Sequence, residues 1–201
     1  TVVPGAVDHI TVLPSPITLV VGTTQTFVAT PYDSYNNVVA GAVLSWGTNV
    51  GSVNSAGFFT AQTTPGSGSV TATNNSVTGS AAVSVIIGPL DHIIVAPSPV
   101  TVVVGDSRLF SAAGYDIYNN LITGLSFNWA ASVGVVNSGG FFTAQTVPAT
   151  GTVTATSGSV VGSAAVDVVP GPVAILMVFP NPVIMVVGTS QSFTIVAYDA
   201  Y

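Results

Sequence analysis

Short runs of apolar and hydroxyl residues alternate along this chain, and glycine or proline interrupts them every few positions. No run repeats apolar residues at the 3.6-residue spacing of an amphipathic helix, and good helix formers are scarce. An alternation with a period of two is typical of strands that bury one face. The pattern therefore predicts an all-β protein.

Seven or eight short strands are predicted in the first part of the chain, enough for a sandwich of two sheets. In chain order they are 8–13, 17–21, 24–32, 43–48, two strands of a hairpin within 51–61 that turns at 55–57, 68–73 and 79–86. Pro14 and Pro16 interrupt the first edge, which is expected to switch between sheets there because proline cannot continue a hydrogen-bonded ladder.

The alternation also predicts which side chains face the core. Trp46 shares a face with Leu44, and a single tryptophan on such a strand is expected at the centre of a sandwich core. In the last two strands, Val70 and Ala72 are expected to lie opposite Val83 and Val85.

One polar stretch recurs along the chain. Tyr32-Asp33-Ser34-Tyr35-Asn36-Asn37 returns 83 residues later as Tyr115-Asp116-Ile117-Tyr118-Asn119-Asn120, and begins again as Tyr198-Asp199-Ala200-Tyr201. Aligning the chain on itself at this offset needs no gap and gives about 47 identities over the 83 positions from Gly5 to Ile87. A period of this length is the size of a small independent domain, not of a solenoid unit.

The repeat sets the expected domain organisation. Two full repeats are predicted at 5–87 and 88–170. Residues 1–4 are expected to be the end of a preceding repeat, because they match 167–170 in register. Residues 171–201 are expected to be the first strands of a third repeat that is either truncated or completed by strand exchange.

Several motifs together resemble the bacterial and archaeal immunoglobulin-like repeats of the group 2 type. They are Val20-Val21-Gly22 before Gln25-Thr26-Phe27, Asp33-Ser34-Tyr35-Asn36-Asn37, Trp46, the segment Val53–Ala61, and Gly68–Thr73. The second copy repeats them, and the resemblance covers essentially the whole chain. It implies tandem immunoglobulin-like β-sandwiches of the kind found in adhesins, surface-layer proteins and extracellular filaments, where such repeats serve as stalks and spacers.

Composition narrows the class of function. Only 4% of the residues are charged, the formal net charge is −6, and Arg108 is the only basic side chain apart from two histidines. A chain with a single cation cannot neutralise a row of phosphates, so neither nucleic acid nor an anionic membrane surface is an expected partner. Lys, Glu and Cys are missing while hydroxyl residues abound, which predicts an extracellular or cell-surface protein kept soluble by hydroxyls, by glycans or by assembly.

The mean hydropathy of +0.71 raises the question of a membrane span. The most apolar run, 168–187, contains four prolines, which an ordinary spanning helix would not accommodate. No membrane insertion is therefore expected within this segment.

The two histidines, His9 and His92, occupy one position of the repeat, and each follows an aspartate. They could be metal ligands or acid/base pairs, or half-exposed strand residues near a domain junction. Because neighbouring residues of a strand point to opposite faces, Asp8 is not expected to orient His9.

The recurring polar stretch is the best candidate for a specific site. Asp91, Asp116 and Asn119 are expected at the same end of the second repeat, where carboxylate and amide oxygens could bind calcium at the junction. The alternative is a turn, because Asp and Asn hydrogen-bond their own backbone and tolerate left-handed conformations, with the flanking tyrosines covering the end of the core. No other cofactor is expected.

Asn74-Asn75-Ser76 is an N-glycosylation sequon at a predicted turn, so Asn74 is a candidate glycan acceptor. The second copy has no sequon at this position.

The sequence contains no motif that supports catalysis. The chain has no Gly-x-Ser-x-Gly elbow, no glutamate and no glycine loop followed by a helix, so it is not expected to be an enzyme. The sequence favours a structural repeat array of a filament, surface layer or adhesin stalk, which self-associates into a homopolymer or a larger assembly. The alternative is an adhesin module that binds a carbohydrate or a receptor.

Overall fold

The computed structural model describes residues 3–201, and every regular element within them is a β-strand. The predicted all-β fold class is confirmed. The chain forms two compact units. The first contains the residues up to Asp91 together with Tyr115–Ile122, and the second contains His92–Gly114 and Thr123–Tyr201. Residues 1–2, half of the expected end of a preceding repeat, lie outside the described residues.

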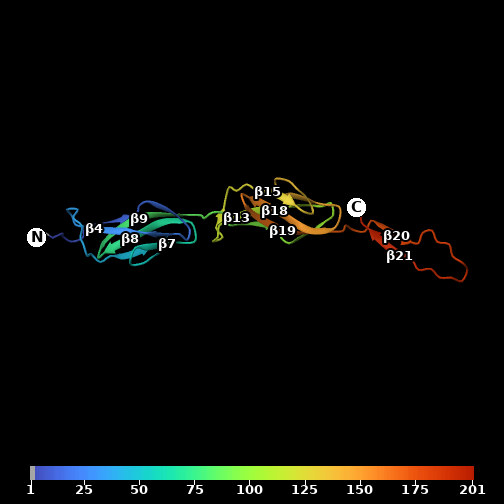
Figure 1. Cartoon of the computed structure of the whole chain (residues 1–201), viewed down its shortest axis with the longest axis horizontal. Helices are drawn as coiled ribbons and strands as arrows, with labels where there is room; N and C mark the ends of the chain where they lie inside the picture. The colour runs from blue at the N-terminus through green and yellow to red at the C-terminus, as the bar shows by residue number, and fades with distance from the viewer. Residues whose placement is uncertain (1–2) are drawn as a thin grey trace. The chain divides into compact units, whose positions relative to one another are not determined.

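The first unit is a β-sandwich. One sheet has the order β2-β9-β8-β5, in which β2 is parallel to β9 and the other pairs are antiparallel. The remaining strands form a β3-β7-β6 sheet and a β1-β4 pair. The bounds are β1 His9–Leu13, β2 Ile17–Val20, β3 Thr24–Thr26, β4 Val28–Tyr32, β5 Ser45–Thr48, β6 Gly51–Val53, β7 Phe58–Ala61, β8 Gly66–Asn74 and β9 Val77–Ile86. Figure 1 shows β4, β8, β9 and β7 running alongside one another in this unit.

The prolines break the first edge as predicted. β1 pairs with β4, whereas β2, which follows directly, pairs with β9 in the other sheet. Pro14 and Pro16 lie between these two strands, and both are preceded by cis peptide bonds. The chain therefore changes sheets where proline removes the backbone donors that would continue one ladder.

The predicted strand 24–32 is wrong as a single element. β3 pairs with β7 and β4 pairs with β1, with Phe27 between them. Its side chain is buried, and its N–H donates to the carbonyl of Gly57 at 2.8 Å. Alternation continues through this point, so the sequence pattern could not show that the backbone changes partners. Residues 9–86 consequently contain nine strands, where the sequence predicts seven or eight.

Phenylalanine, not tryptophan, occupies the centre of the core. Phe27 and Phe59 are fully buried and meet edge to face, with ring centroids 5.7 Å apart. Trp46 is half-buried and packs against the side of this cluster, with its ring beside Gly57. The expectation that Trp46 is central is therefore wrong, because β5 is the edge strand of its sheet.

The last hairpin has a different register from the predicted one. Val70 lies opposite Ala81 and Ala72 lies opposite Gly79, whereas Val83 lies opposite Gly68. The strands run up to Asn74 and from Val77, so the turn is tighter than the sequence suggested. The predicted partners share the inner face but are not directly opposite each other.

The second unit repeats this arrangement. Its four-stranded sheet has the order β11-β19-β18-β15, a second sheet has the order β12-β17-β16, and β10 lies beside β13. The bounds are β10 His92–Ala96, β11 Val100–Val103, β12 Ser107–Leu109, β13 Ser111–Tyr115, β15 Asn128–Ala131, β16 Gly134–Val136, β17 Phe141–Ala144, β18 Ala149–Ser157 and β19 Val160–Val169. The short strand β14 (Leu121–Ile122) lies in the segment that belongs to the first unit. Phe110 and Phe142 meet edge to face at 5.9 Å, as their counterparts do in the first unit.

The last residues form an antiparallel hairpin of β20 (Ile175–Phe179) and β21 (Thr194–Tyr198), labelled at the red end of the chain in Figure 1. Its apolar side chains are exposed along both strands. Leu176 and Val178 are exposed, although the side chains at the same repeat positions in β1 and β10 are buried. None of the described residues forms a helix that could cross a membrane.

Candidate functional site: the aspartate loops

A buried aspartate organises the loop that follows β4. Asp33 is only 2% exposed, and its Oδ1 accepts hydrogen bonds from the backbone N–H groups of Tyr35 and Asn37, both at 2.9 Å. Its Oδ2 accepts the backbone N–H of Gly5 at 2.9 Å, which ties the entry of the repeat to the loop. The side-chain amide of Asn37 donates to both carboxylate oxygens.

The loop after β13 reproduces this arrangement around Asp116, which is fully buried. Its Oδ1 accepts the backbone N–H groups of Tyr118 and Asn120 at 2.9 Å, and its Oδ2 accepts that of Gly88 at 3.0 Å. The Asn120 amide again donates to both oxygens. Because Gly88 lies two residues after the end of β9, this carboxylate fixes the segment that connects the repeats.

These hydrogen bonds hold both carboxylates in the ionised form. The N–H of Gly5, followed by those of Asn37 and Tyr35, lowers the pKa of Asp33 to about 2 against the opposing effect of burial. For Asp116, burial alone would raise the pKa, but the bonds from Asn120, Gly88 and Tyr118 outweigh it and lower the pKa to about 2. Both loops are therefore charged throughout the neutral range.

The geometry supports the turn and not the calcium site at Asp116. Both carboxylate oxygens face N–H donors, which a cation would have to displace. Asn119 adopts a left-handed conformation with φ 63°, and its N–H donates to the Asp116 carbonyl at 3.0 Å. The backbone N–H of Asp91 donates to the carbonyl of Tyr115. Among residues 3–201 no group of three or more His, Asp, Glu or Cys side chains could hold a metal ion.

Within the first unit, the Asp116 loop also contacts the turns of the first repeat. The Asn120 side-chain amide donates to the carbonyl of Thr63 at 2.8 Å. The Tyr118 ring lies over Gly22, where any Cβ atom would collide with the tyrosine hydroxyl. Gly22 has a φ of +70°, so glycine suits both the turn and the close approach. Sequence reasoning missed these partners because Thr63 lies 57 residues from Asn120.

Tyr35 and Tyr118 do not cover the core of their own repeat as expected. Tyr118 covers the Gly22 turn and is 43% exposed, whereas its counterpart Tyr35 is 84% exposed. Tyr32 lies against its own repeat, where it stacks on His9 with ring centroids 5.2 Å apart.

The third loop makes the same bonds within the second unit. The Gly171 N–H donates to Oδ2 of Asp199 at 2.9 Å, and the Tyr201 N–H donates to Oδ1 at 3.0 Å. The Tyr201 hydroxyl lies beside Gly105, in the way that Tyr118 lies beside Gly22. Positions 83 residues apart thus form equivalent contacts.

The expectation that Asp8 cannot orient His9 is wrong. Nδ1 of His9 lies 3.2 Å from Oδ2 of Asp8. β1 begins at His9, so Asp8 precedes the strand and the alternation of side chains does not apply to it. Both side chains are largely exposed, and the pair adds little beyond a surface contact.

Asn74 ends β8, and its side-chain nitrogen donates to the carbonyl of Val43 at 2.8 Å. A glycan would attach to this same nitrogen, so the predicted modification requires that hydrogen bond to open.

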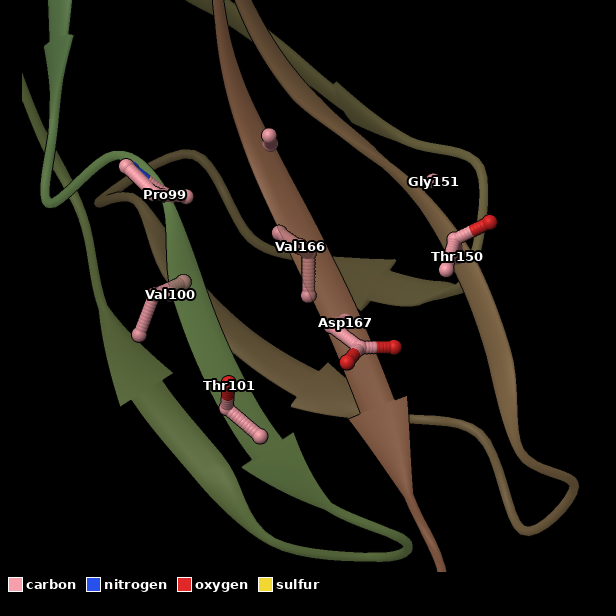
Figure 2. A pocket seen from close by; sticks show the side chains of 8 residues that line it. Pro99, Val100, Thr101, Thr150, Gly151, Val166 and Asp167 are labelled. Carbon is pink, nitrogen blue, oxygen red and sulfur yellow. The ribbon is translucent and has the colours of Figure 1, made fainter.

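A shallow groove of about 360 Å³ lies on the four-stranded sheet of the second unit. In Figure 2, Thr101, Asp167 and Thr150 lie in a row across neighbouring strands, in agreement with their registered pairing. Ser84 occupies the position of Asp167 in the first repeat. One exposed carboxylate among hydroxyls supplies neither a nucleophile paired with a base nor a second acid.

No protein-family model and no curated protein matches the chain. Among solved structures, the Escherichia coli adhesin FdeC has a TM-score of 0.45 at 21% identity, over 100% of this chain and 77% of that one. Domains 1–6 of the surface-layer protein SbsC have a TM-score of 0.38 at 24% identity, over 87% of this chain and 30% of that one. Drosophila N-cadherin EC1–4 has a TM-score of 0.49 at 13% identity, over 82% and 50% of the two chains. Similarities this distant identify neither a ligand nor an activity.

Proposed function

We propose that this chain is a non-catalytic structural repeat array of a cell-surface or extracellular assembly, such as a filament, a surface layer or an adhesin stalk. The observation that carries the proposal is the recurrence of one contact. Asp33, Asp116 and Asp199 each bind the N–H of the glycine that begins their repeat. Repeats that fix their own connecting segments suit a load-bearing spacer.

The chemistry of the chain supports the same function. The aspartates that are most protected from solvent serve backbone geometry, and the charge on the surface is sparse. Hydroxyl side chains are common among the exposed sheet positions, as in the row beside Asp167. Such a surface favours association through shape and hydrogen bonds over attraction between charges.

In the finer form of the proposal, subunits join by strand exchange. The β20–β21 hairpin exposes Leu176, Val178 and Phe193, whose counterparts in the two full repeats are buried. In those repeats the cover comes from strands equivalent to β7, β8 and β9. Strands of this kind supplied by another chain would complete the third core and link two subunits.

Two measurements test the proposal. Electron microscopy of the purified 201-residue chain and of the native material should show filaments or ordered arrays, and material that stays dispersed under all conditions would contradict an assembly role. Hydrogen exchange of the β20–β21 amides should slow as protein concentration rises. Exchange that does not depend on concentration would reject strand exchange while leaving the array function standing.

The alternative adhesin role has its own test. Glycan arrays and receptor pull-downs with the whole chain should show no saturable binding if the chain is only a structural array. Saturable binding to a defined sugar or protein would favour the carbohydrate- or receptor-binding function.

A further inference from the structure

We propose that the Asp33 loop of the first repeat is a docking surface for a further repeat of this same kind, which it binds through Tyr35 and Asn37. The inference rests on the proposed function as a repeat array and names the contact by which one repeat engages the next. It comes from the equivalent Asp116 loop, whose partner is present in the first unit.

The partner surface is defined by two features of the first repeat. One is the Gly22 turn, which lacks a Cβ and receives the ring of Tyr118. The other is the outward carbonyl of Thr63, which accepts the amide of Asn120 at 2.8 Å. The second repeat has Gly105 and Thr146 at these positions, and Tyr201 lies beside Gly105. We call the glycine turn and the threonine carbonyl together the socket.

The Asp33 loop carries the groups that fill such a socket. Tyr35 and Asn37 match Tyr118 and Asn120 in type and in repeat position. The backbone of the loop is held in the same conformation, with φ 62° at Asn36 against 63° at Asn119. Its carboxylate is saturated by the same set of N–H donors, so the loop is already shaped for docking.

The Asp33 loop differs from the Asp116 loop in that its tyrosine and amide are not covered by a second repeat. Tyr35 is 84% exposed, twice the exposure of Tyr118. The Asn37 amide donates to Asp33, whereas the Asn120 amide donates both to Asp116 and to the carbonyl of Thr63. A large exposed aromatic beside an amide donor is typical of an interface centre. The occupant that fits is the socket of another repeat of this same kind.

The test adds a repeat in front of the full chain. A copy of residues 5–87 is inserted before Gly5, with Tyr35→Phe in the inserted copy so that only the original Tyr35 reports. Hydroxyl-radical footprinting with mass spectrometry then measures oxidation of Tyr35. The expected result is a fall of about twofold, to the level of Tyr118, in proportion to the two exposures. Oxidation equal to that in the 201-residue chain would overturn the proposal.

A matched pair of glycine variants separates docking from crowding. Gly22→Ala in the inserted copy places a Cβ in the socket and should restore the oxidation of Tyr35. Gly41→Ala imposes the same left-handed strain, with φ +80° against +70°, but meets nothing within 4 Å and should leave Tyr35 protected. Protection that is equal in both variants would show that the socket is not the partner.

The unextended chain gives a second measurement that does not depend on folding of the insertion. Gly22→Ala should raise the oxidation of Tyr118, and Gly41→Ala should not. Failure of Tyr118 to respond would remove the socket and the proposal with it. A chain that forms filaments while Tyr35 stays fully reactive would keep the array function and reject this docking surface.

Discussion

At the scale of single residues, the decisive groups are buried aspartates that act as acceptors for backbone N–H donors. Asp33 and Asp116 each hold their loop to the segment that enters the repeat, through the N–H groups of Gly5 and Gly88. A carboxylate suits this role because two oxygens can accept from four donor nitrogens at once, as they do in Asp116.

Asp116→Asn should lower the melting temperature by several degrees. The amide has nearly the same shape, but its NH₂ group would face N–H donors and leave them without an acceptor in a buried site. Differential scanning calorimetry measures the change, with the exposed Asp106→Asn as the control that removes the same charge. An equal shift in both variants would mean that net charge, and not the loop, is responsible.

The stability of the protein should fall in acid between about pH 4 and pH 2. The folded pKa of Asp33 and Asp116 is about 2, below the usual 3.8, so the stabilisation is fully present above pH 4. It is lost as the pH falls through the folded pKa, because the unfolded state binds protons first. Urea unfolding at a series of pH values measures this, and the Asp33→Asn, Asp116→Asn double variant should show a flatter profile.

At the scale of elements, burial alternates sharply along a strand, even between two residues of the same type. Phe141 and Phe142 are neighbours in β17, one half exposed and the other fully buried. The pleat sends them to opposite faces of the sheet, and only one meets Phe110.

Phe142→Ala should destabilise the fold by about 3–5 kcal/mol, the usual cost of removing a buried aromatic ring. Phe141→Ala is the matched control, and it should cost less than about 1 kcal/mol because its ring is half exposed. Chemical denaturation of both variants gives the two values. Equal losses would place both rings in the core and contradict the register of β17.

Gly162→Ala should destabilise the second unit by about 1–3 kcal/mol, because β10 crosses β19 at this point and a Cβ would collide with the carbonyl of Ile93. Gly139→Ala is the control in the same repeat, since its Cβ would meet only Asn137 at 3.4 Å. Thermal unfolding of the two variants should separate them clearly. A neutral Gly162→Ala would indicate that the two strands can move apart at no cost.

At the scale of the whole molecule, the segment that enters each repeat is held by a hydrogen bond to an aspartate of the protein itself. We therefore expect that a chelator leaves the melting temperature unchanged. A bound metal would stabilise the folded state by linkage, and its removal would lower the transition. Thermal unfolding with and without a chelator, and then with excess Ca²⁺, checks this. A calcium-dependent rise would restore the cation site at Asp91, Asp116 and Asn119.

The modification at Asn74 remains a prediction for the native protein. Mass spectrometry of material from its natural source should show a glycan on this residue, while Asn75, which lacks the sequon, should be unmodified. A bare Asn74 would agree with its hydrogen bond to Val43 in the structure.

The sequence alone determined the fold class, most strand positions and the change of sheet at Pro14 and Pro16. These depend on local causes, namely alternation, chain stiffness and missing backbone donors. It also singled out the aspartate loops, because repetition is visible without a structure. Tertiary structure decided the rest: the break at Phe27, the peripheral place of Trp46, and the partners of Tyr118 and Asn120. Each of these depends on contacts between residues far apart in the chain, which a local pattern does not encode.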